Sequence, residues 1–295
     1  MKKVLLASTA LVMSAGFAAA DVSVGGDGRM GVISTDGSDL SFTSRIRISF
    51  SASGETDLGL AFGGSIRADN SGGGAAGTAG SVFVEGTFGR ISMGDVSGAP
   101  EAAVGDLSGV GLTGLGDLNE LTYLSNADRP AARWDYVTGD LGLHVSVDNP
   151  NAGTADDGDA YGIAVTYSAG DISFGLGYET SDDAGGLGVG ADHIVAGVTA
   201  GLGDASIKVV YGTADVDGGD DFEQYGISLD FVTGATTLTG FWITKDSTVA
   251  ALDSGDAYGI GVSYDLGGGA ALKAGYVDGD ALSDASYDLG ISMSF

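Results

Sequence analysis

The chain has 295 residues, and its 40 acidic residues against 12 lysines and arginines give a formal net charge of −28. A chain this acidic lacks the basic patch that nucleic-acid binding requires, so we expect no nucleic-acid partner. It has no cysteine, so disulfides do not contribute to its stability. Glycine occurs 54 times and proline only 3 times, a combination that is not typical of disordered or collagen-like chains.

Residues 1–20 have the organisation of an export signal. Lys2 and Lys3 precede the apolar run VLLASTALVMSAGF, and AAA precedes Asp21. A basic start, a short apolar stretch and small residues at the end are typical of a cleaved signal peptide. We therefore expect export, cleavage after Ala20 and a single domain over residues 21–295. An N-terminal membrane anchor is the alternative.

Alternation of bulky apolar and small residues with a period of two dominates the rest of the chain and predicts β-strands. After residue 20, no segment has the roughly 20 consecutive apolar residues of a spanning helix, so a membrane-embedded form must use strands. Sixteen segments alternate in this way: 22–32, 42–50, 58–66, 82–88, 91–93, 134–137, 141–147, 161–167, 172–178, 194–200, 207–211, 225–231, 236–244, 258–264, 272–276 and 287–295.

The connections between these segments alternate between short and long. The short ones, such as FGR, VTGD and SAGD, are centred on glycine, as tight hairpins are. Short turns on one rim and long loops on the other are typical of an outer-membrane barrel. The long connections are 69–81, 95–130, 148–159, 181–192, 214–223, 245–256 and 278–286, with a shorter one at 35–40. The fold class we predict is all-β, a 16-stranded antiparallel transmembrane β-barrel.

Aromatic residues at both ends of an apolar stripe indicate the face that meets lipid. Three pairs are six residues apart, which is about 20 Å along a strand and roughly matches the apolar band of a membrane barrel with its aromatic girdles. Because the opposite face carries only small residues, we expect it to line a water-filled lumen. A soluble all-β protein is the alternative, but such a face could not pack so large a core. The pairs are Tyr161 and Tyr167, Tyr225 and Phe231, and Tyr258 and Tyr264.

Arginines and acids in the first half of the chain are the candidate site residues. By parity with their apolar neighbours, five arginines point into the lumen: Arg29, Arg45, Arg47, Arg67 and Arg90. Surface charge that serves only solubility is the alternative. The longest interruption, 95–130, is acidic and partly apolar, so we expect it to pack against the barrel and to be functional. Its candidate acids are Glu101, Asp106, Asp117 and Glu120.

Residues that could support catalysis or metal binding are few. Only His144 and His193 could act as a histidine base, and we expect neither to be catalytic. GVGLTG at 109–114 matches a dinucleotide-binding glycine pattern but lacks its strand and helix context. The acidic run 215–223 fails the EF-hand pattern. We expect no enzyme activity, no cofactor and no certain metal site, and weak calcium binding by acidic loops stays open.

These features resemble the general diffusion porins of α-proteobacteria, especially those of photosynthetic purple bacteria. The resemblance covers residues 21–295 and rests on DVSVGGDGRMGV, SFTSRIRISF, TFGRISMGD, SYDLGGGA and YDLGISMSF. It implies a homotrimer whose third external loop folds into the lumen as an eyelet, with acids opposite arginines on the facing wall. Residues 95–130 match that loop, and the five arginines match the wall.

The last strand resembles the signal that the outer-membrane assembly machinery reads. Tyr287, Leu289, Ile291, Met293 and Phe295 share one face, which a simple lipid-facing stripe explains equally well. Taken together, the sequence predicts a passive pore for small polar solutes and ions in the outer membrane of a Gram-negative cell. A structural or adhesive barrel is the alternative, although an adhesin would lengthen several outer loops. A hydrolase would need catalytic residues that the sequence does not offer.

Overall fold

A computed structural model describes residues 21–70, 76–77, 80–124, 131–148, 159–183, 189–218, 220–248 and 253–295. The predicted signal peptide lies outside these residues. The described strands are β1 (Asp21–Ser34), β2 (Ser41–Glu55), β3 (Ala61–Asp69), β4 (Ala76–Gly77), β5 (Ser81–Gly86), β6 (Gly89–Gly94), β7 (Ala131–Thr138), β8 (Leu141–Val147), β9 (Ala160–Ala169), β10 (Ile172–Ser181), β11 (Ala191–Leu202), β12 (Ala205–Val216), β13 (Asp220–Thr233), β14 (Thr236–Ser247), β15 (Gly255–Gly267), β16 (Ala270–Gly279) and β17 (Ser286–Ser294).

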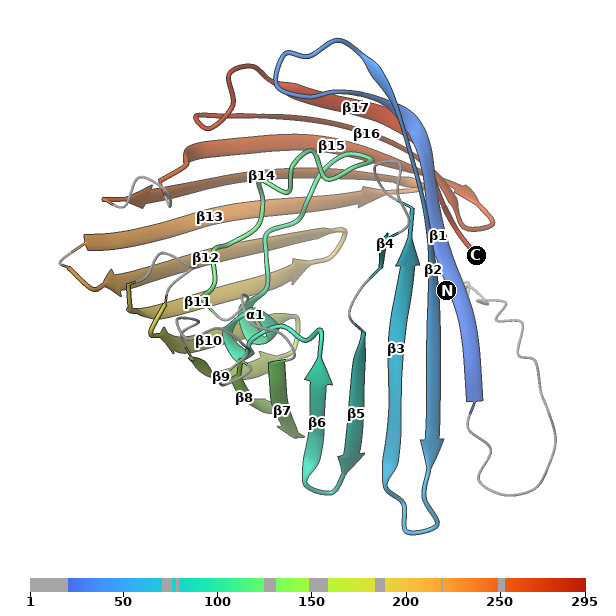
Figure 1. Cartoon of the computed structure of the whole chain (residues 1–295). Coiled ribbons are helices and arrows are strands. Elements are labelled where there is room, and N and C mark those ends of the chain that lie inside the picture. Colours follow the sequence, from blue (N-terminus) through green and yellow to red (C-terminus); the bar gives the residue numbers. More distant parts are fainter. Residues whose placement is uncertain are drawn as a thin grey trace.

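The strands close into one antiparallel barrel, as predicted (Figure 1). Each strand pairs with its neighbours in the chain, and β1 pairs with β17 to complete the ring. The seam ends in two reciprocal backbone hydrogen bonds, Gly26 N to Phe295 O at 2.7 Å and Phe295 N to Gly26 O at 3.0 Å. The two-residue β4 pairs with β3 next to the stretch of β3 that pairs with β5, so β4 and β5 together occupy one place in the ring. The barrel therefore has sixteen strand positions.

The predicted segments all fall on strands, but three of their ends were wrong: Phe295 follows the last residue of β17, and the other two lie in turns. Leu58 lies in the turn before β3, where Thr56 N donates to Leu60 O at 2.9 Å and Gly59 has a φ of 80°. Phe88 lies in the turn after β5, where Gly89 has a φ of 96°. In both places a glycine in the left-handed region closes a tight turn that the apolar pattern alone does not reveal.

A short helix, α1 (Ala99–Val104), was not predicted from the sequence. Pro100 lies in its first turn, where a missing N–H costs nothing. Gly105 ends it with a φ of 61°, and its N–H donates to Glu101 O at 2.7 Å. No helix in the described part of the chain is long and apolar enough to cross a membrane.

The inner face is not open space throughout, which corrects the prediction. Figure 1 shows α1 inside the barrel and the segment after it running along the inner wall toward β15 and β16. This segment forms an apolar cluster with lumen-facing residues of the wall. Its buried members are Val104, Leu107, Val110, Leu115, Leu121, Tyr123, Val195, Val210, Phe241, Ile243 and Val277. The core of the protein therefore lies within the lumen, between the segment and the strands from β11 to β16.

Glycines of the inner wall provide the space for this segment. A Cβ added to Gly177 would lie 2.6 Å from the Pro100 side chain, and one added to Gly197 would lie 2.9 Å from Val104. Further along the barrel, a Cβ on Gly261 would lie 2.9 Å from Val110. The small residues of these strands are thus a continuous seat for the inward segment rather than the lining of a wide channel.

Candidate functional site

The first half of the inward segment is fixed to the wall by side chains of β12 and β13. Lys208 Nζ donates to the carbonyl oxygens of Val104 at 2.5 Å and of Asp106 at 2.7 Å. Ser108 Oγ donates to Asp230 Oδ2 at 2.6 Å. Since Lys208 and Asp230 come from adjacent strands, they hold the chain just after α1 in one position.

The tip of the segment is clamped between β17 and β1. Asp288 is 3% exposed and accepts hydrogen bonds from Leu112 N at 2.9 Å, Thr113 N at 2.7 Å and Thr113 Oγ1 at 2.8 Å. Arg29 Nη1 donates to Leu112 O at 3.4 Å and to Thr113 O at 3.2 Å. The glycine pattern GVGLTG therefore builds this tip.

The returning half is held by a buried polar network on β10, β11 and β13. The Gln224 side chain pairs with both backbone groups of Thr122 at 2.8 Å, and Glu179 Oε1 accepts from Leu124 N at 2.8 Å. His193 Nδ1 lies 2.8 Å from Glu179 Oε1. Gln224, Glu179 and Asp288 were not predicted from the sequence to anchor the segment. The only feature of the sequence that indicates them is that each is a polar residue on the face of its strand that otherwise carries small residues.

Four of the predicted arginines form one group on the first three strands. Arg29 and Arg45 are register partners between β1 and β2, and Arg47 and Arg67 lie next to them on β2 and β3. Their carboxylate partners on the wall are Asp27, 3.3 Å from Arg45, and Asp69, which lies 3.2 Å from Arg47 and 2.9 Å from Arg67. These four arginines are called the arginine wall below.

Arg90 lies apart from the arginine wall. It sits one residue after the β5–β6 turn, where its guanidinium lies 3.5 Å from Glu85 and stacks over the Phe83 ring at 3.7 Å. Arg90 pairs in register with Asp135, which agrees with the prediction that Arg90 faces the lumen. Arg90 nevertheless lies near the rim of short turns. Its neighbour Arg133, which the sequence analysis did not select, donates to Ser97 O at 2.9 Å and fixes the start of the inward segment.

The predicted acids lie on the inward segment, close enough to influence one another. Glu120 is exposed, and its pKa is raised, first by partial burial and then by the negative charges of Asp117, Asp106 and Glu101. Asp106 Oδ1 also accepts from Leu121 N at 2.8 Å and so joins the two halves of the segment. The structure thus brings all four candidate acids together.

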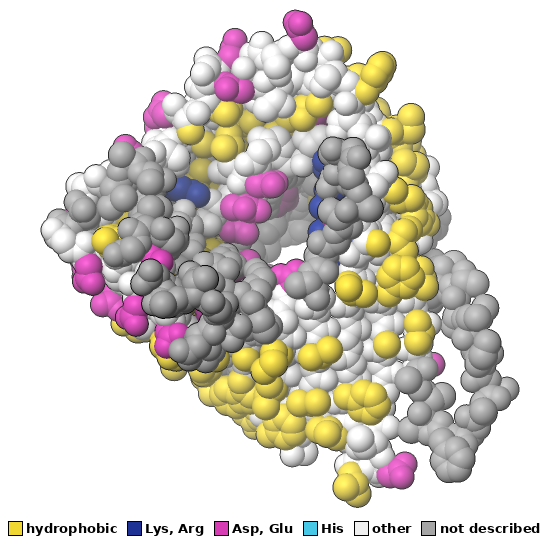
Figure 2. All heavy atoms as spheres, viewed as in Figure 1, with side chains coloured by type: hydrophobic (Ala, Val, Ile, Leu, Met, Phe, Trp, Pro, Cys, Tyr) yellow, Lys and Arg dark blue, Asp and Glu magenta, His cyan; other side chains and the backbone are white. Residues whose placement is uncertain are grey.

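Acidic and basic side chains both border the central hollow, and Lys245 lies on the acid side, within the electrostatic influence of Asp106 and Glu120. Figure 2 shows acidic side chains on one margin of the hollow and lysine or arginine side chains on the margin across from them. At the base of the segment, Asp95 lines a smaller hollow of about 320 Å³ together with Arg67. Because the segment fills the half of the lumen along β9–β17, the open half is bounded by the arginine wall and the short strands β5–β7.

The two histidines face the inside of the barrel. His144 Nδ1 lies 2.7 Å from Asp135 Oδ1, and its Nε2 lies 3.4 Å from Thr166 Oγ1. Thr166 belongs to the regular ladder between β8 and β10, so its backbone amides are paired and do not form an oxyanion hole. His144 on β8 thus contacts Asp135 on β7 and Thr166 on β9 within the wall.

The six predicted interface aromatics are all exposed on the outer surface of the barrel, on β9, β13 and β15. Several outward tyrosines donate to acids near the rim of long loops, for example Tyr161 to Asp159 at 3.0 Å and Tyr258 to Asp278 at 3.1 Å. Within the described ranges, no group of three or more acidic, histidine or cysteine side chains is arranged to hold a metal ion. Calcium binding by the acidic loops stays a prediction.

Comparisons with known proteins agree with this architecture. A family model described as Gram-negative porin matches residues 7–282. A porin of Rhodobacter capsulatus is 35% identical over 304 residues, which cover 93% of this chain and 100% of that protein. A porin of Fuscovulum blasticum is 27% identical over 302 residues, with the same coverage. A porin structure refined at 1.8 Å resolution superposes with a TM-score of 0.80 at 32% identity, covering 93% of this chain and all of that one.

Proposed function

Because this chain belongs to the family of Gram-negative porins, we propose that its pore is narrowest between the inward segment 95–124 and the arginine wall. The protein is a passive diffusion pore of the outer membrane. The observation that supports the position of the constriction is the anchoring of the segment to the strands β8–β17, which leaves an opening only beside the arginines. Small polar solutes and ions pass through this opening.

The proposed constriction separates charges of opposite sign. Glu101, Asp106, Asp117 and Glu120 lie on the segment, and the arginine wall borders the opening beside it, with Arg29 reaching the tip near Asp117. Charges next to low-dielectric protein interact more strongly than charges in bulk water. Side-chain charges at a constriction set selectivity. A polar solute can align its dipole between the two sides, whereas an apolar solute must displace ordered water without this gain.

Single-channel recording in a planar bilayer tests the pore. We expect stepwise, ohmic currents from purified protein, in groups of three for a trimer, and entry of small sugars into liposomes that carry the protein. The absence of current from protein whose barrel is intact by circular dichroism would contradict a diffusion pore. Steps of normal size in a variant that lacks residues 106–121 would contradict only the proposed place of the constriction.

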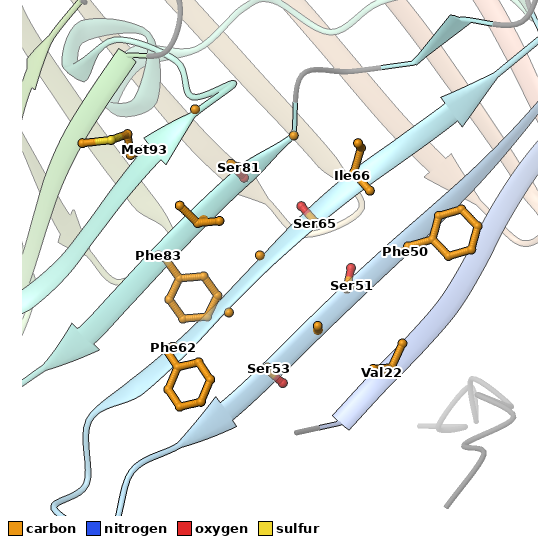
Figure 3. Close-up of a pocket in the computed structure, with 16 residues that line it drawn as sticks. Val22, Phe50, Ser51, Ser53, Phe62, Ser65, Ile66, Ser81, Phe83 and Met93 are labelled. Carbon is orange, nitrogen blue, oxygen red and sulfur yellow. The ribbon is translucent and has the colours of Figure 1, made fainter. Parts of the chain in front are cut away.

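We also propose that the barrels associate as homotrimers through the outer face of β1–β6. Residues 21–94 contain no tyrosine or tryptophan, so this face lacks the amphipathic rings that outward tyrosines of β7–β17 supply, although it carries exposed phenylalanines. It carries a shallow apolar groove of about 920 Å³ (Figure 3). Val22, Phe50, Phe62, Ile66 and Met93 surround the groove, and Gly64 leaves its floor open.

Two further roles are proposed for residues selected from the sequence. The aromatic pairs of β9, β13 and β15 contact outer-membrane lipid. Tyr287 and Phe295 mark the last strand for the assembly machinery, so deletion of Phe295 should leave unassembled protein in the periplasm.

The protein has no catalytic role and needs no cofactor, which is supported by the engagement of both histidines in wall contacts. Weak calcium binding by the acidic loops is measurable by calorimetry.

A further inference from the structure

A separate hollow lies beyond the tip of the inward segment, on the side of the β15–β16 turn. Its volume is about 420 Å³, and its charged lining consists of Arg29, Arg45 and Lys273 together with Asp27 and Asp265. A second hollow of about 260 Å³ shares Lys273 and adds Thr237, Thr239 and Ser263. Lys273 therefore lies between two polar hollows that both touch the tip of the segment.

The three cations come from neighbouring strands. Arg45 is the register partner of Arg29, and Arg29 is the register partner of Ser292 on β17. Lys273 on β16 pairs with Gly290, two residues from Ser292. Two strand spacings, about 10 Å, separate β1 from β16, so a small solute between them can reach both long side chains.

The cationic side chains of this group are only partly engaged by the carboxylates around them. Asp27 is engaged by Arg45 at 3.3 Å, and Asp265 Oδ1 accepts from Gly267 N at 2.8 Å in the adjacent turn. Lys273 has no hydrogen bond or ion pair with any residue that the structure describes. The Nε atoms of Arg29 and Arg45 are buried without a hydrogen-bond partner among the same residues. Arg29 donates from its Nη1 to backbone carbonyls and lies within the electrostatic influence of Asp288 and Asp117, but it forms no direct ion pair with any residue that the structure describes.

We propose that this hollow is a binding subsite for solutes that carry an oxyanion, a phosphate or a carboxylate, on the short-turn side of the constriction. The inference rests on the proposed pore and adds a solute class to it. Oxyanions suit the site because guanidinium and ammonium donors, here those of Arg29, Arg45 and Lys273, form short, charge-assisted hydrogen bonds with them. Such a site would hold anionic solutes for a short time and then release them, as conduction requires.

Lys273 is the residue whose removal tests the subsite, because it anchors neither the segment nor the barrel. Currents through the full-length trimer are recorded in potassium chloride at pH 7.5, with inorganic phosphate or acetate replacing chloride at constant ionic strength. We expect phosphate to reduce the chloride current with saturation. In Lys273→Gln, the half-blocking concentration should rise about tenfold, the loss expected for one hydrogen bond to a charged group. Lys273→Arg should restore it.

Arg90→Gln is the matched control, because it removes one positive charge from the same lumen at a place outside the hollow. Its half-blocking phosphate concentration should stay within about twofold of the parent value, measured against its own chloride conductance. Equal shifts in Lys273→Gln and Arg90→Gln would overturn the subsite in favour of a general field. A parent channel that conducts but shows no phosphate block would also overturn it. A protein that forms no channel would contradict the proposed function instead.

Comparing the two anions identifies the solute. Block by phosphate alone assigns the site to phosphorylated solutes, and block by both anions assigns it to oxyanions in general. Native-like migration of each variant in unheated gels confirms that the barrel has assembled, so a lost block cannot come from misfolding.

Discussion

Arg45 and Arg47 lie two residues apart on β2 and face the open half of the lumen, each beside a wall carboxylate. Changing both to glutamine removes two positive charges and leaves Asp27 and Asp69 less balanced. We expect the reversal potential in a salt gradient to move toward cation selectivity, with a permeability ratio changed roughly fivefold for a difference of about 1 kcal/mol. Conductance should stay similar or rise.

The matched variant with lysine at both positions keeps the charge and should keep the selectivity of the parent protein. An unchanged reversal potential in the glutamine variant, with trimers intact, would show that the arginine wall lies away from the narrowest section.

Glu120 provides a pH dependence with a defined sign. Its pKa is raised by partial burial and by Asp117, Asp106 and Glu101, so on acidification it takes up a proton at a higher pH than an ordinary glutamate does. Cation preference should therefore fall as the pH drops toward 4, starting with this group. Glu120→Gln should have lower cation preference at neutral pH and lack the first step of the titration. Identical titration curves for the two proteins would contradict this assignment.

At the level of secondary-structure elements, the packing of α1 against the glycines of the inner wall can be tested by mutation. A Cβ at Gly177 would have Pro100 as its nearest neighbour, with the Pro100 side chain 2.6 Å away. Gly177→Val should therefore displace the start of the inward segment, raise the single-channel conductance and increase current noise, while the barrel remains folded. Gly240→Val is the control, because a Cβ at Gly240 would meet no atom closer than 3.6 Å. Equal conductance in the two variants would show that the seat does not position the segment.

Among the elements, the strands and the existence of the inward segment were predictable, but the internal structure of the segment was not. A strand with one apolar face shows a period of two, and this pattern located even short strands such as β6 and β7. Residues 99–121 show no such period, because their apolar side chains face the wall at irregular intervals set by the anchors Lys208, Gln224 and Asp288. Each anchor is a single polar residue more than 80 positions away in the chain, so no local pattern could reveal it.

The candidate site, too, was predictable from the sequence only in part. The alternation of side chains along each strand predicted that the five arginines lie on the inner face. It does not indicate how far along the barrel axis each arginine lies. Arg90 was therefore grouped with the arginine wall although it lies by the short turn to β5. Lys273 was overlooked because it stands alone in its strand, far in sequence from Arg29.

The whole molecule should be a trimer that resists SDS until it is heated. All backbone groups of a closed barrel can be satisfied internally, which makes each protomer resistant to denaturation. The apolar face of β1–β6 is proposed as the contact between protomers, so Ile66→Arg should weaken the trimer and leave the barrel folded. Unheated gels and native mass in mild detergent measure this. A monomer-sized parent protein by both methods would contradict trimerisation.

The seam between β1 and β17 affects the order of folding. Every other pairing joins strands that follow one another in the chain, so hairpins can form as soon as both of their strands are available. The seam alone joins the two ends of the domain, with Gly26 against Phe295. Until β1 and β17 have paired, any partial sheet has two unpaired edges that can recruit other chains. Closure of the ring is thus both the slowest contact to find and the step that ends the risk of aggregation.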